Sequence, residues 1–260
     1  MEITALLVKE LREKTGVGLM NCKKALTESN GDVEHAIKYL RKKGLSSASK
    51  KADRSTNEGQ FFVASTENNA VLLELNCETD FVAKNDDFRQ LGNTLATRAL
   101  ENKNTTPEKI AKDDISNAVL KLGENISIKQ IKHLTSDGSL ASYIHSNGKI
   151  GVIVTFSGKV DPEMGKNIAM HIAATNPSCV NPDDVNQADL DSEKEIIRTQ
   201  AKEEGKPDAV IEKIVAGRIN KYFKEFCLNE QPYIKDDKQS IKQLLPQGTH
   251  ITSFTRLTLG

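Results

Sequence analysis

The sequence contains no tryptophan, and aromatic residues make up only 5% of its 260 positions. Its 36 Lys and Arg residues balance its 36 Asp and Glu residues, so the formal net charge is zero. A balanced chain gives no general case for binding nucleic acid or a membrane, because both attract strongly basic proteins. Since aromatic side chains are so few, any aromatic residue that fits no predicted core becomes a candidate for function.

Cysteine is also scarce, and four residues stand far apart: Cys22, Cys77, Cys179 and Cys227. None belongs to a CxxC pair, so zinc-ligand spacing is absent, and a disulfide framework is not expected in a chain of this length. The N-terminus carries Glu2, Lys9 and Glu10, which is too much charge for a signal peptide. No apolar run approaches the ~18 residues of a membrane-spanning helix. We therefore expect a soluble cytoplasmic protein without a membrane partner.

Motifs of common enzyme classes are missing as well. The sequence has no GxxxxGK[ST] phosphate loop, no HExxH zinc motif and no GxSxG nucleophile turn. His171 lies in an Ala- and Ile-rich segment, which favours a core histidine over a ligand. Cys77 is followed by Glu78, and nearby carboxylates raise the pKa of a thiol, which favours a buried structural role. Asp86 and Asp87 are typical of a helix start rather than of a metal site.

These absences predict a protein that is not an enzyme. We expect no catalytic residue, no metal site, no cofactor and no direct nucleotide binding. A nucleophilic role for Cys77 or Cys179 is the weakest of the alternatives.

Charge is distributed unevenly along the chain. Residues 1–54 hold 12 Lys and Arg against 7 Asp and Glu, whereas residues 55–180 hold 12 against 15. Apolar residues at helical spacing predict three short helices before a C-terminal end at Lys42–Gly44. The polar segment 45–57 is expected to be a mobile linker. Residues 1–54 are therefore predicted to form a separate basic module with its linker.

The next segment alternates between strand and helix signals. Two hairpins are predicted at the turns Asn68–Asn69 and Asn147–Gly148, and each is followed by apolar residues at helical spacing. A hairpin followed by a helix is therefore predicted twice. The pattern predicts an α+β core with antiparallel sheets over residues 55–180, in two related subdomains of about 55–138 and 139–180.

Residues 181–228 have a different pattern, with apolar residues at helical spacing on both sides of Pro207. Ser192 is the expected cap of the first helix. The apolar stripe of the second helix is longer than that of the first, which leaves apolar surface for another partner. We predict an inserted antiparallel helical hairpin, with a homodimer contact through residues 190–228. Residues 229–260 are expected to return to the core through a short helix and a final strand.

The most specific feature is the segment Asn76–Asn85, NCETDFVAKN. A strand must end near Cys77 and a helix follows soon after, so Thr79–Val82 fall on a tight corner. Phe81 joins no helical stripe there. Two interpretations remain open: Phe81 packs into the core, as large aromatic side chains usually do, or it is an exposed anchor beside the Asp80 carboxylate.

Three segments resemble the elongation factor Ts family, the exchange factors of the translational GTPase elongation factor Tu. They are TDFVAKN in the corner, HIAATNP at 171–177, and the N-terminal LVKELREKTGVGLMNCKKALTESNGDVEHAI. The similarity runs from Ile3 to about Leu259. It implies a guanine-nucleotide exchange factor that binds elongation factor Tu, displaces Mg²⁺ and promotes GDP release, so that GTP can rebind during translation elongation.

The resemblance also implies which residues act. Asp80 and Phe81 would insert near the magnesium and phosphate site of the GTPase, and Val82 and Ala83 would complete that turn. Other partner contacts are implied for Lys23, Lys50, Lys51, Leu122, Gly123, His145 and Ile234. The N-terminal module would have a ubiquitin-associated-like fold, and the hairpin would be a dimerisation coiled coil. Family members often continue into a terminal helix, which this sequence lacks after Gly260.

A second interpretation of function also remains open. The basic N-terminal module could make the protein a non-enzymatic adaptor, or an RNA-binding protein through Lys42, Lys43, Lys50 and Lys51. These lysines can equally be solvated charges at a helix end and in a linker. The protein retained in a pull-down distinguishes the interpretations, because only an exchange factor should retain a nucleotide-free GTPase.

Overall fold

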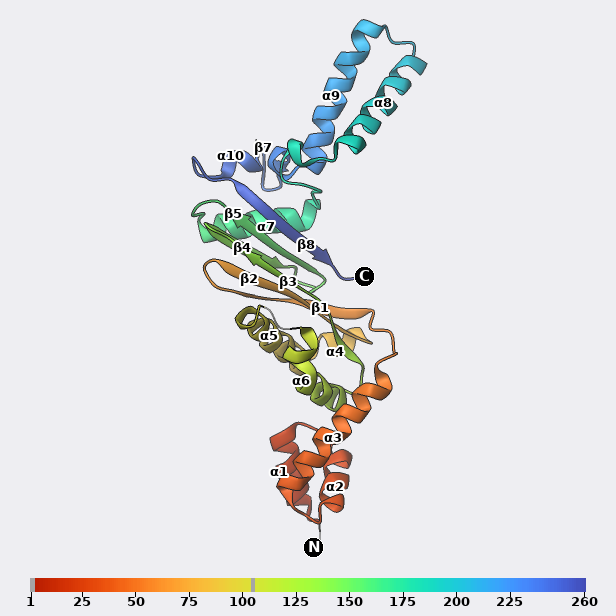
Figure 1. Cartoon of the computed structure of the whole chain (residues 1–260), viewed down its shortest axis with the longest axis vertical. Coiled ribbons are helices and arrows are strands. Elements are labelled where there is room, and N and C mark those ends of the chain that lie inside the picture. Colours follow the sequence, from red (N-terminus) through yellow and green to blue (C-terminus); the bar gives the residue numbers. More distant parts are fainter. Residues whose placement is uncertain (1–2, 104–105) are drawn as a thin grey trace.

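The computed structural model describes residues 3–103 and 106–260. Figure 1 shows an elongated arrangement, with the N-terminal helices at one end, the sheets in the middle and a helical hairpin at the other end. Groups of helices alternate with groups of strands along the chain, and the strands pair antiparallel in small sheets. The α+β fold predicted from the sequence is confirmed.

The N-terminal module contains α1 (Ala5–Thr15), α2 (Leu19–Glu28) and α3 (Val33–Lys51). Its small core holds Leu11, Cys22 and Leu26, all fully buried. Gly16 ends α1 in a left-handed conformation with φ of 66°, which glycine adopts without the strain of a side chain. The N-terminal helices predicted from the apolar spacing are present.

The third helix is longer than predicted, and the expected mobile linker at 45–57 is wrong. α3 passes through Gly44 and continues to Lys51, so only residues 52–57 connect it to the first strand. Gly44 is buried where α3 packs against α6 (Pro107–Leu122), and a Cβ atom there would lie 2.9 Å from the carbonyl oxygen of Ser116. Glycine is used here for close approach of two helices rather than as a helix stop.

The first sheet joins three antiparallel strands in the order β1 (Glu58–Ser65), β2 (Asn69–Cys77) and β3 (Ile126–Thr135). The central strand β2 is buried along almost its whole length. α5 (Asp86–Glu101) and α6 pack with this sheet around a core that includes Phe62 and Phe88, whose ring centroids are 6.1 Å apart. Phe88 is fully buried, as the helical spacing predicts.

The second sheet is built in the order β4 (Ser139–Ile144), β5 (Ile150–Phe156) and β8 (Ile251–Thr258). α7 (Pro162–Thr175) packs on it, and η2 (Leu228–Glu230), β6 (Pro232–Tyr233), β7 (Asp236–Ser240) and α10 (Ile241–Leu244) complete this part. His171 of α7 is fully buried, and its Nε2 lies 2.8 Å from Oε1 of Gln231. The prediction of a core histidine is confirmed.

The two sheets pack against each other through a separate apolar cluster that includes Phe61, Leu72 and Ile153. Gly151 lies in this contact, because a Cβ atom there would be 2.7 Å from Cδ1 of Leu72. The final strand β8 pairs with β5, so residues near the C-terminus complete the second sheet. The middle of the molecule is therefore a stack of two sheets with helices on the outer faces (Figure 1).

The hairpin consists of α8 (Gln187–Glu203) and α9 (Asp208–Phe226), after a short 3-10 turn, η1 (Pro182–Asp184). It projects away from the sheets (Figure 1). Its arms meet through Leu190, Ile197, Ala201, Ile211, Val215 and Ile219. The expected cap at Ser192 is wrong: the cap is Asn186, six residues earlier, because Leu190 already belongs to the buried stripe. No helix of residues 3–103 and 106–260 has the length and apolar run needed to cross a membrane.

The contact at Gly44 predicts opposite effects for one substitution at two helical glycines. Gly44→Ala forces a methyl group against a backbone carbonyl, and such overpacking costs ~1–3 kcal/mol, more than the ~0.5–1 kcal/mol that alanine gains over glycine in a helix. Gly217→Ala in α9 is the matched control, since no atom lies within 4 Å of its Cβ position. Urea unfolding should show a loss of about 1 kcal/mol for the first variant and a small gain for the second. Equal effects would contradict the close helix contact.

Candidate functional site

The corner after β2 is a single helical turn, α4 (Asp80–Ala83). Thr79 precedes it in an extended conformation, and its Oγ1 accepts a hydrogen bond from the backbone N–H of Val82 at 3.4 Å. The N–H of Ala83 donates to the carbonyl oxygen of Thr79 at 3.1 Å. Asn85 then caps α5 through the N–H of Asp87 at 2.8 Å. The chain therefore passes from strand to helix through two capped turns that follow each other almost directly.

Phe81 points away from the protein on this turn. It is 82% exposed, which makes it the most exposed large apolar side chain among the described residues. Ala83 is only 4% exposed and Val82 packs at the edge of the core, so these two residues anchor the turn. The interpretation of Phe81 as a core residue is wrong, because the inner face of a one-turn helix is already filled by its neighbours.

Asp80 is held by its own helix turn. Nζ of Lys84 donates to Oδ2 of Asp80 at 2.6 Å, and both side chains remain partly exposed. This hydrogen bond lowers the pKa of Asp80, and the charge of Lys84 adds to the effect. The carboxylate is therefore ionised at neutral pH and lies directly beside the exposed ring of Phe81.

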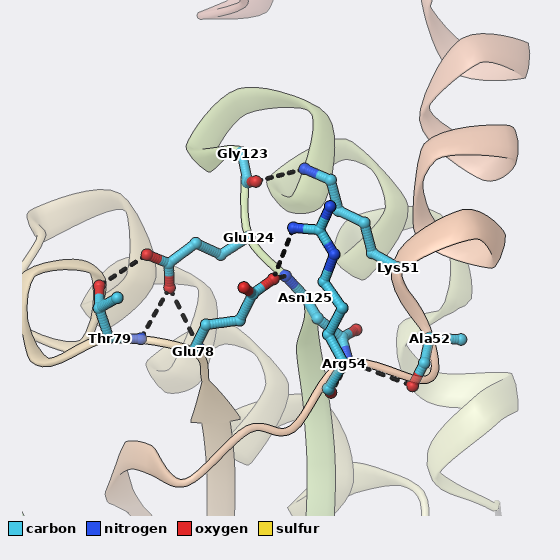
Figure 2. Close-up of polar contacts among 8 residues, drawn as sticks. All are labelled: Lys51, Ala52, Arg54, Glu78, Thr79, Gly123, Glu124 and Asn125. Atoms are coloured by element: carbon cyan, nitrogen blue, oxygen red, sulfur yellow. Dashed lines mark hydrogen bonds and ion pairs between the residues drawn. The ribbon is translucent and has the colours of Figure 1, made fainter.

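Glu124 fixes the start of the corner from another part of the chain. Its Oε2 accepts hydrogen bonds from the backbone N–H groups of Glu78 and Thr79 at 3.1 and 2.9 Å, and its Oε1 accepts from the Thr79 hydroxyl at 2.6 Å. Figure 2 shows the carboxylate between these groups. The Thr79 hydroxyl thus donates to Glu124 while it accepts from Val82, so the carboxylate and the helical turn are joined through one oxygen.

Glu78 makes the reciprocal contact. Its Oε1 accepts from the backbone N–H of Asn125 at 2.7 Å and from Arg54 at 3.3 Å. The bond from Asn125 holds the pKa of Glu78 below its usual range, and Arg54 contributes further. The Asn125 side chain donates in turn to the carbonyl oxygens of Ala52 and Arg54 at 3.3 and 2.8 Å. Two chain segments are therefore linked in both directions.

The N-terminal module reaches the same cluster through the end of α3. Nζ of Lys51 donates a hydrogen bond to the carbonyl oxygen of Gly123, the residue before Glu124 (Figure 2). Gly123 ends α6 in a left-handed conformation with φ of 83°, which lets the chain turn into β3. The corner, the end of α6 and the end of α3 thus form one polar cluster.

The structure brings some of the predicted contact residues together. Lys51 and Gly123 lie in the corner cluster, Lys50 is exposed beside Lys51, and Leu122 packs against the core of the first sheet. His145 is on the β4–β5 turn, where its Nδ1 lies 3.1 Å from the Tyr143 hydroxyl. Gly148 of that turn accepts a hydrogen bond from the N–H of Phe61 in β1. The first residue of β1 pairs with Cys77, which directly precedes the corner. His145 therefore lies at the same end of the stacked sheets as the corner.

Two predicted contact residues lie elsewhere. Lys23 is exposed on α2, within the N-terminal module. Ile234 is exposed between β6 and β7, and its backbone N–H donates to Nδ1 of His171 at 3.4 Å, near the base of the helical hairpin. The predicted contact residues therefore spread along the long axis of the molecule instead of forming one pocket.

The sequence alone did not identify the residues that hold the corner, which are Arg54, Glu78, Glu124 and Asn125. In particular, it did not show that the Glu78 side chain accepts a hydrogen bond from a backbone N–H. The available signal was the LGEN run, in which an acid stands between a helix-ending glycine and a strand. An acidic residue at this position neither caps a helix nor joins the apolar face of a strand. Its presence therefore indicates a contact with a distant part of the chain. Its partners, 45 and 46 residues away, were not identifiable from spacing.

Cys77 ends β2, directly before the corner. Cys77 is buried and its thiol donates to the carbonyl oxygen of Thr79 at 3.2 Å. Burial, and next the charge of Glu124, raise the pKa of Cys77 to about 12, so the predicted structural thiol is confirmed. Within residues 3–103 and 106–260, no three His, Cys, Asp or Glu side chains gather in a way that could hold a metal ion.

Comparison with known protein families gives a match to the family described as Elongation factor TS over residues 78–260. The match begins at Glu78 and includes the corner, Glu124, the hairpin and the final strand, which is more than half of the chain. This agrees with the resemblance found in the sequence motifs. The chain belongs to the elongation factor Ts family of translation elongation factors.

Proposed function

We propose that the protein is a guanine-nucleotide exchange factor for the GTPase elongation factor Tu, that it acts in the cytoplasm, and that it makes and breaks no covalent bonds. The observation that carries this proposal is the Phe81 ring, 82% exposed on a corner whose backbone N–H groups are held by the carboxylate of Glu124. An apolar side chain exposed at a rigid position is typical of a binding anchor.

Phe81 supplies the apolar part of the interaction. Burying a phenylalanine side chain is worth ~1.5–3 kcal/mol, and here that energy is gained only in a complex. Because the corner is already ordered by Thr79 and Glu124, little conformational entropy is lost when a partner closes around it. The ring therefore acts as a wedge that enters the partner near the groups holding Mg²⁺ and phosphate.

Asp80 supplies the charged part. An ionised carboxylate beside the wedge competes for the polar groups around the magnesium of the GTPase, and the ion is displaced. Each ~1.4 kcal/mol of nucleotide binding energy lost in the transition state speeds release tenfold. Coupling is reciprocal, so bound nucleotide weakens factor binding equally. The factor thus speeds exchange without choosing the nucleotide, and an excess of GTP over GDP sets the direction.

The remaining contacts extend this interface. His145, Lys51 and Gly123 lie at the corner's end of the sheets, with Lys50 and Leu122 beside them. Lys23 and Ile234 would touch the GTPase at more distant points. The RNA-binding alternative loses support, since Lys51 donates to Gly123 and Lys43 donates to Oδ1 of Asn21 at 2.7 Å, which engages two of its four lysines within the chain.

Substitution of Phe81 tests the proposal directly. Because the ring is exposed, Phe81→Ala should change the free energy of unfolding by no more than ~0.5 kcal/mol. Loss of the anchor should cost about 2 kcal/mol of binding, so the rate of labelled GDP release, measured with this protein below saturation, should fall roughly thirtyfold. Asp80→Asn should lose less. Lys202→Ala, at an exposed position in the distant hairpin, is the control. A large fall in melting temperature with normal GDP release would overturn the wedge.

Glu124 should act as a positioning residue for the same corner. Glu124→Ala leaves two backbone N–H groups and the Thr79 hydroxyl without their acceptor, which costs ~1–3 kcal/mol of stability. Well below the melting temperature, we expect slower GDP release and faster hydrogen exchange at the amides of Glu78 and Thr79, although Phe81 is unchanged. Glu124→Gln keeps an acceptor oxygen and should restore part of both.

Removal of a partly exposed ion pair between α5 and α6 serves as the control for Glu124. Asp87 pairs with Lys121 at 2.7 Å. Asp87→Ala should leave the hydrogen-exchange rates of the Glu78 and Thr79 amides unchanged. If Glu124→Ala speeds amide exchange but GDP release keeps its normal rate, order at the corner is not needed for function.

We also propose that the helical hairpin forms a homodimer contact. The arms cover most of each other's apolar residues, but Ile196 and Val210 remain 48% and 42% exposed on its outside. These two side chains are the apolar surface that a second copy would bury.

Deletion and charge substitution test the dimer separately. Leu228, inside the predicted range 190–228, is buried in the core of the second sheet, so the excised segment should be 187–226 with a short linker. The shortened protein should keep cooperative unfolding of its sheets and lose self-association in light scattering. The double variant Ile196→Glu, Val210→Glu should give the same monomer with the hairpin intact. Self-association that persists in both would exclude the hairpin as the contact.

A further inference from the structure

Two cysteines that are 48 positions apart in the sequence meet at the base of the hairpin. Cys179 precedes α8 and Cys227 follows α9, and their Sγ atoms lie 3.5 Å apart. Both are free thiols. The sequence showed no cysteine pair, because the contact exists only once the hairpin has brought its two ends together.

The backbone holds these two residues in place. Cys179 and Cys227 form a parallel β-bridge. The N–H of Ser178 donates to the carbonyl oxygen of Phe226 at 2.9 Å, and the N–H of Leu228 donates to that of Cys179 at 2.9 Å. A hydrogen-bonded backbone therefore holds the two cysteines side by side.

The other two cysteines provide a contrast. Cys22 is buried in the core of the N-terminal module and donates to the carbonyl oxygen of Val17 at 3.2 Å. Cys77 is buried in the core of the first sheet and donates to Thr79. These thiols lie in separate cores of the molecule, so neither can approach the other or the pair at the hairpin base without unfolding.

We propose that Cys179 and Cys227 are a modification site, at which a small-molecule disulfide of the glutathione class converts the two thiols into a reversible intramolecular disulfide. The product ties the entry of the hairpin to its exit. This proposal is separate from nucleotide exchange at the corner, because the second sheet lies between the corner and the base of the hairpin (Figure 1).

The reaction is a pair of thiol–disulfide exchanges. The Cys179 thiolate attacks one sulfur of the small disulfide, its S–S bond breaks, and one small thiolate leaves and takes up the proton that Cys179 lost. The Cys227 sulfur then loses its proton, attacks the Cys179 sulfur and displaces the second small thiol. Two protein thiols are oxidised by two electrons in all, and one small disulfide is reduced to two thiols.

Cys179 is the first residue to react because it is partly accessible, whereas Cys227 is completely buried. Burial raises the pKa of both thiols, that of Cys227 to about 12. Neither thiol is therefore activated on its own, and the reaction depends on proximity. Once Cys179 carries the small thiol, the neighbouring sulfur is already in position to displace it.

The full-length reduced protein should be incubated in glutathione redox buffers, quenched with acid, alkylated and digested for mass spectrometry. We expect one cross-linked peptide pair joining Cys179 and Cys227, with Cys22 and Cys77 recovered as alkylated thiols. Because the bond closes a long loop, the oxidised protein should melt several degrees higher than the reduced protein, and added dithiothreitol should reverse the shift.

Variants distinguish the second step from the first. Cys227→Ser should accumulate glutathione on Cys179 to about tenfold or more above its occupancy in the unsubstituted protein, because the resolving sulfur is absent. Cys227→Ala repeats the test if the serine hydroxyl is not tolerated in the buried site. Equal occupancy in both proteins, a disulfide between two copies, or thiols that stay reduced in the most oxidising buffer would each overturn the proposal.

Discussion

The carboxylate of Glu124 is the contact on which the functional corner depends. A strand that ends beside a helix start leaves backbone N–H groups without partners, and such groups are costly when water is only partly available. Glu124 accepts from two of them and from the Thr79 hydroxyl. Its position follows from Gly123, whose left-handed conformation ends α6 and turns the chain toward the corner. One side chain therefore converts a loose connection into a fixed one.

A fixed corner allows an apolar ring to remain in water. In a flexible loop, Phe81 would collapse onto the nearest apolar surface, and a partner would have to extract it. Here Val82 and Ala83 already fill the space beneath the turn, and the backbone N–H of Val82 is held by Thr79. Exposure of the ring follows from occupancy of the inner face. The hydrophobic energy that folding leaves unused at Phe81 is available for binding.

Patterns within one element were readable from the sequence, whereas contacts between distant elements were not. The hairpin turns, the helical stripe with Phe88 and the core position of His171 follow from local spacing, and the structure contains them. Gly44 looked like a helix stop because glycine usually is one; only the approach of α6 shows that it is a contact. Glu124 and its acceptor role, like the Cys179–Cys227 pair, connect residues at least 45 positions apart. The family motif located Phe81 on the corner, but its exposure depends on what its neighbours fill.

The elongated shape keeps the molecule's two chemical features apart. The corner is fixed to the first sheet and to the end of α3, whereas the cysteine pair lies where the hairpin leaves the second part (Figure 1). The two cores meet through the small cluster between the sheets and through the contact of the β4–β5 turn with β1. Changes at well-separated sites without shared partners are usually additive in free energy. Oxidation at the hairpin base should therefore change the hairpin while the geometry around Phe81 stays as it is, so one chain can combine a constant corner with a variable distal arm.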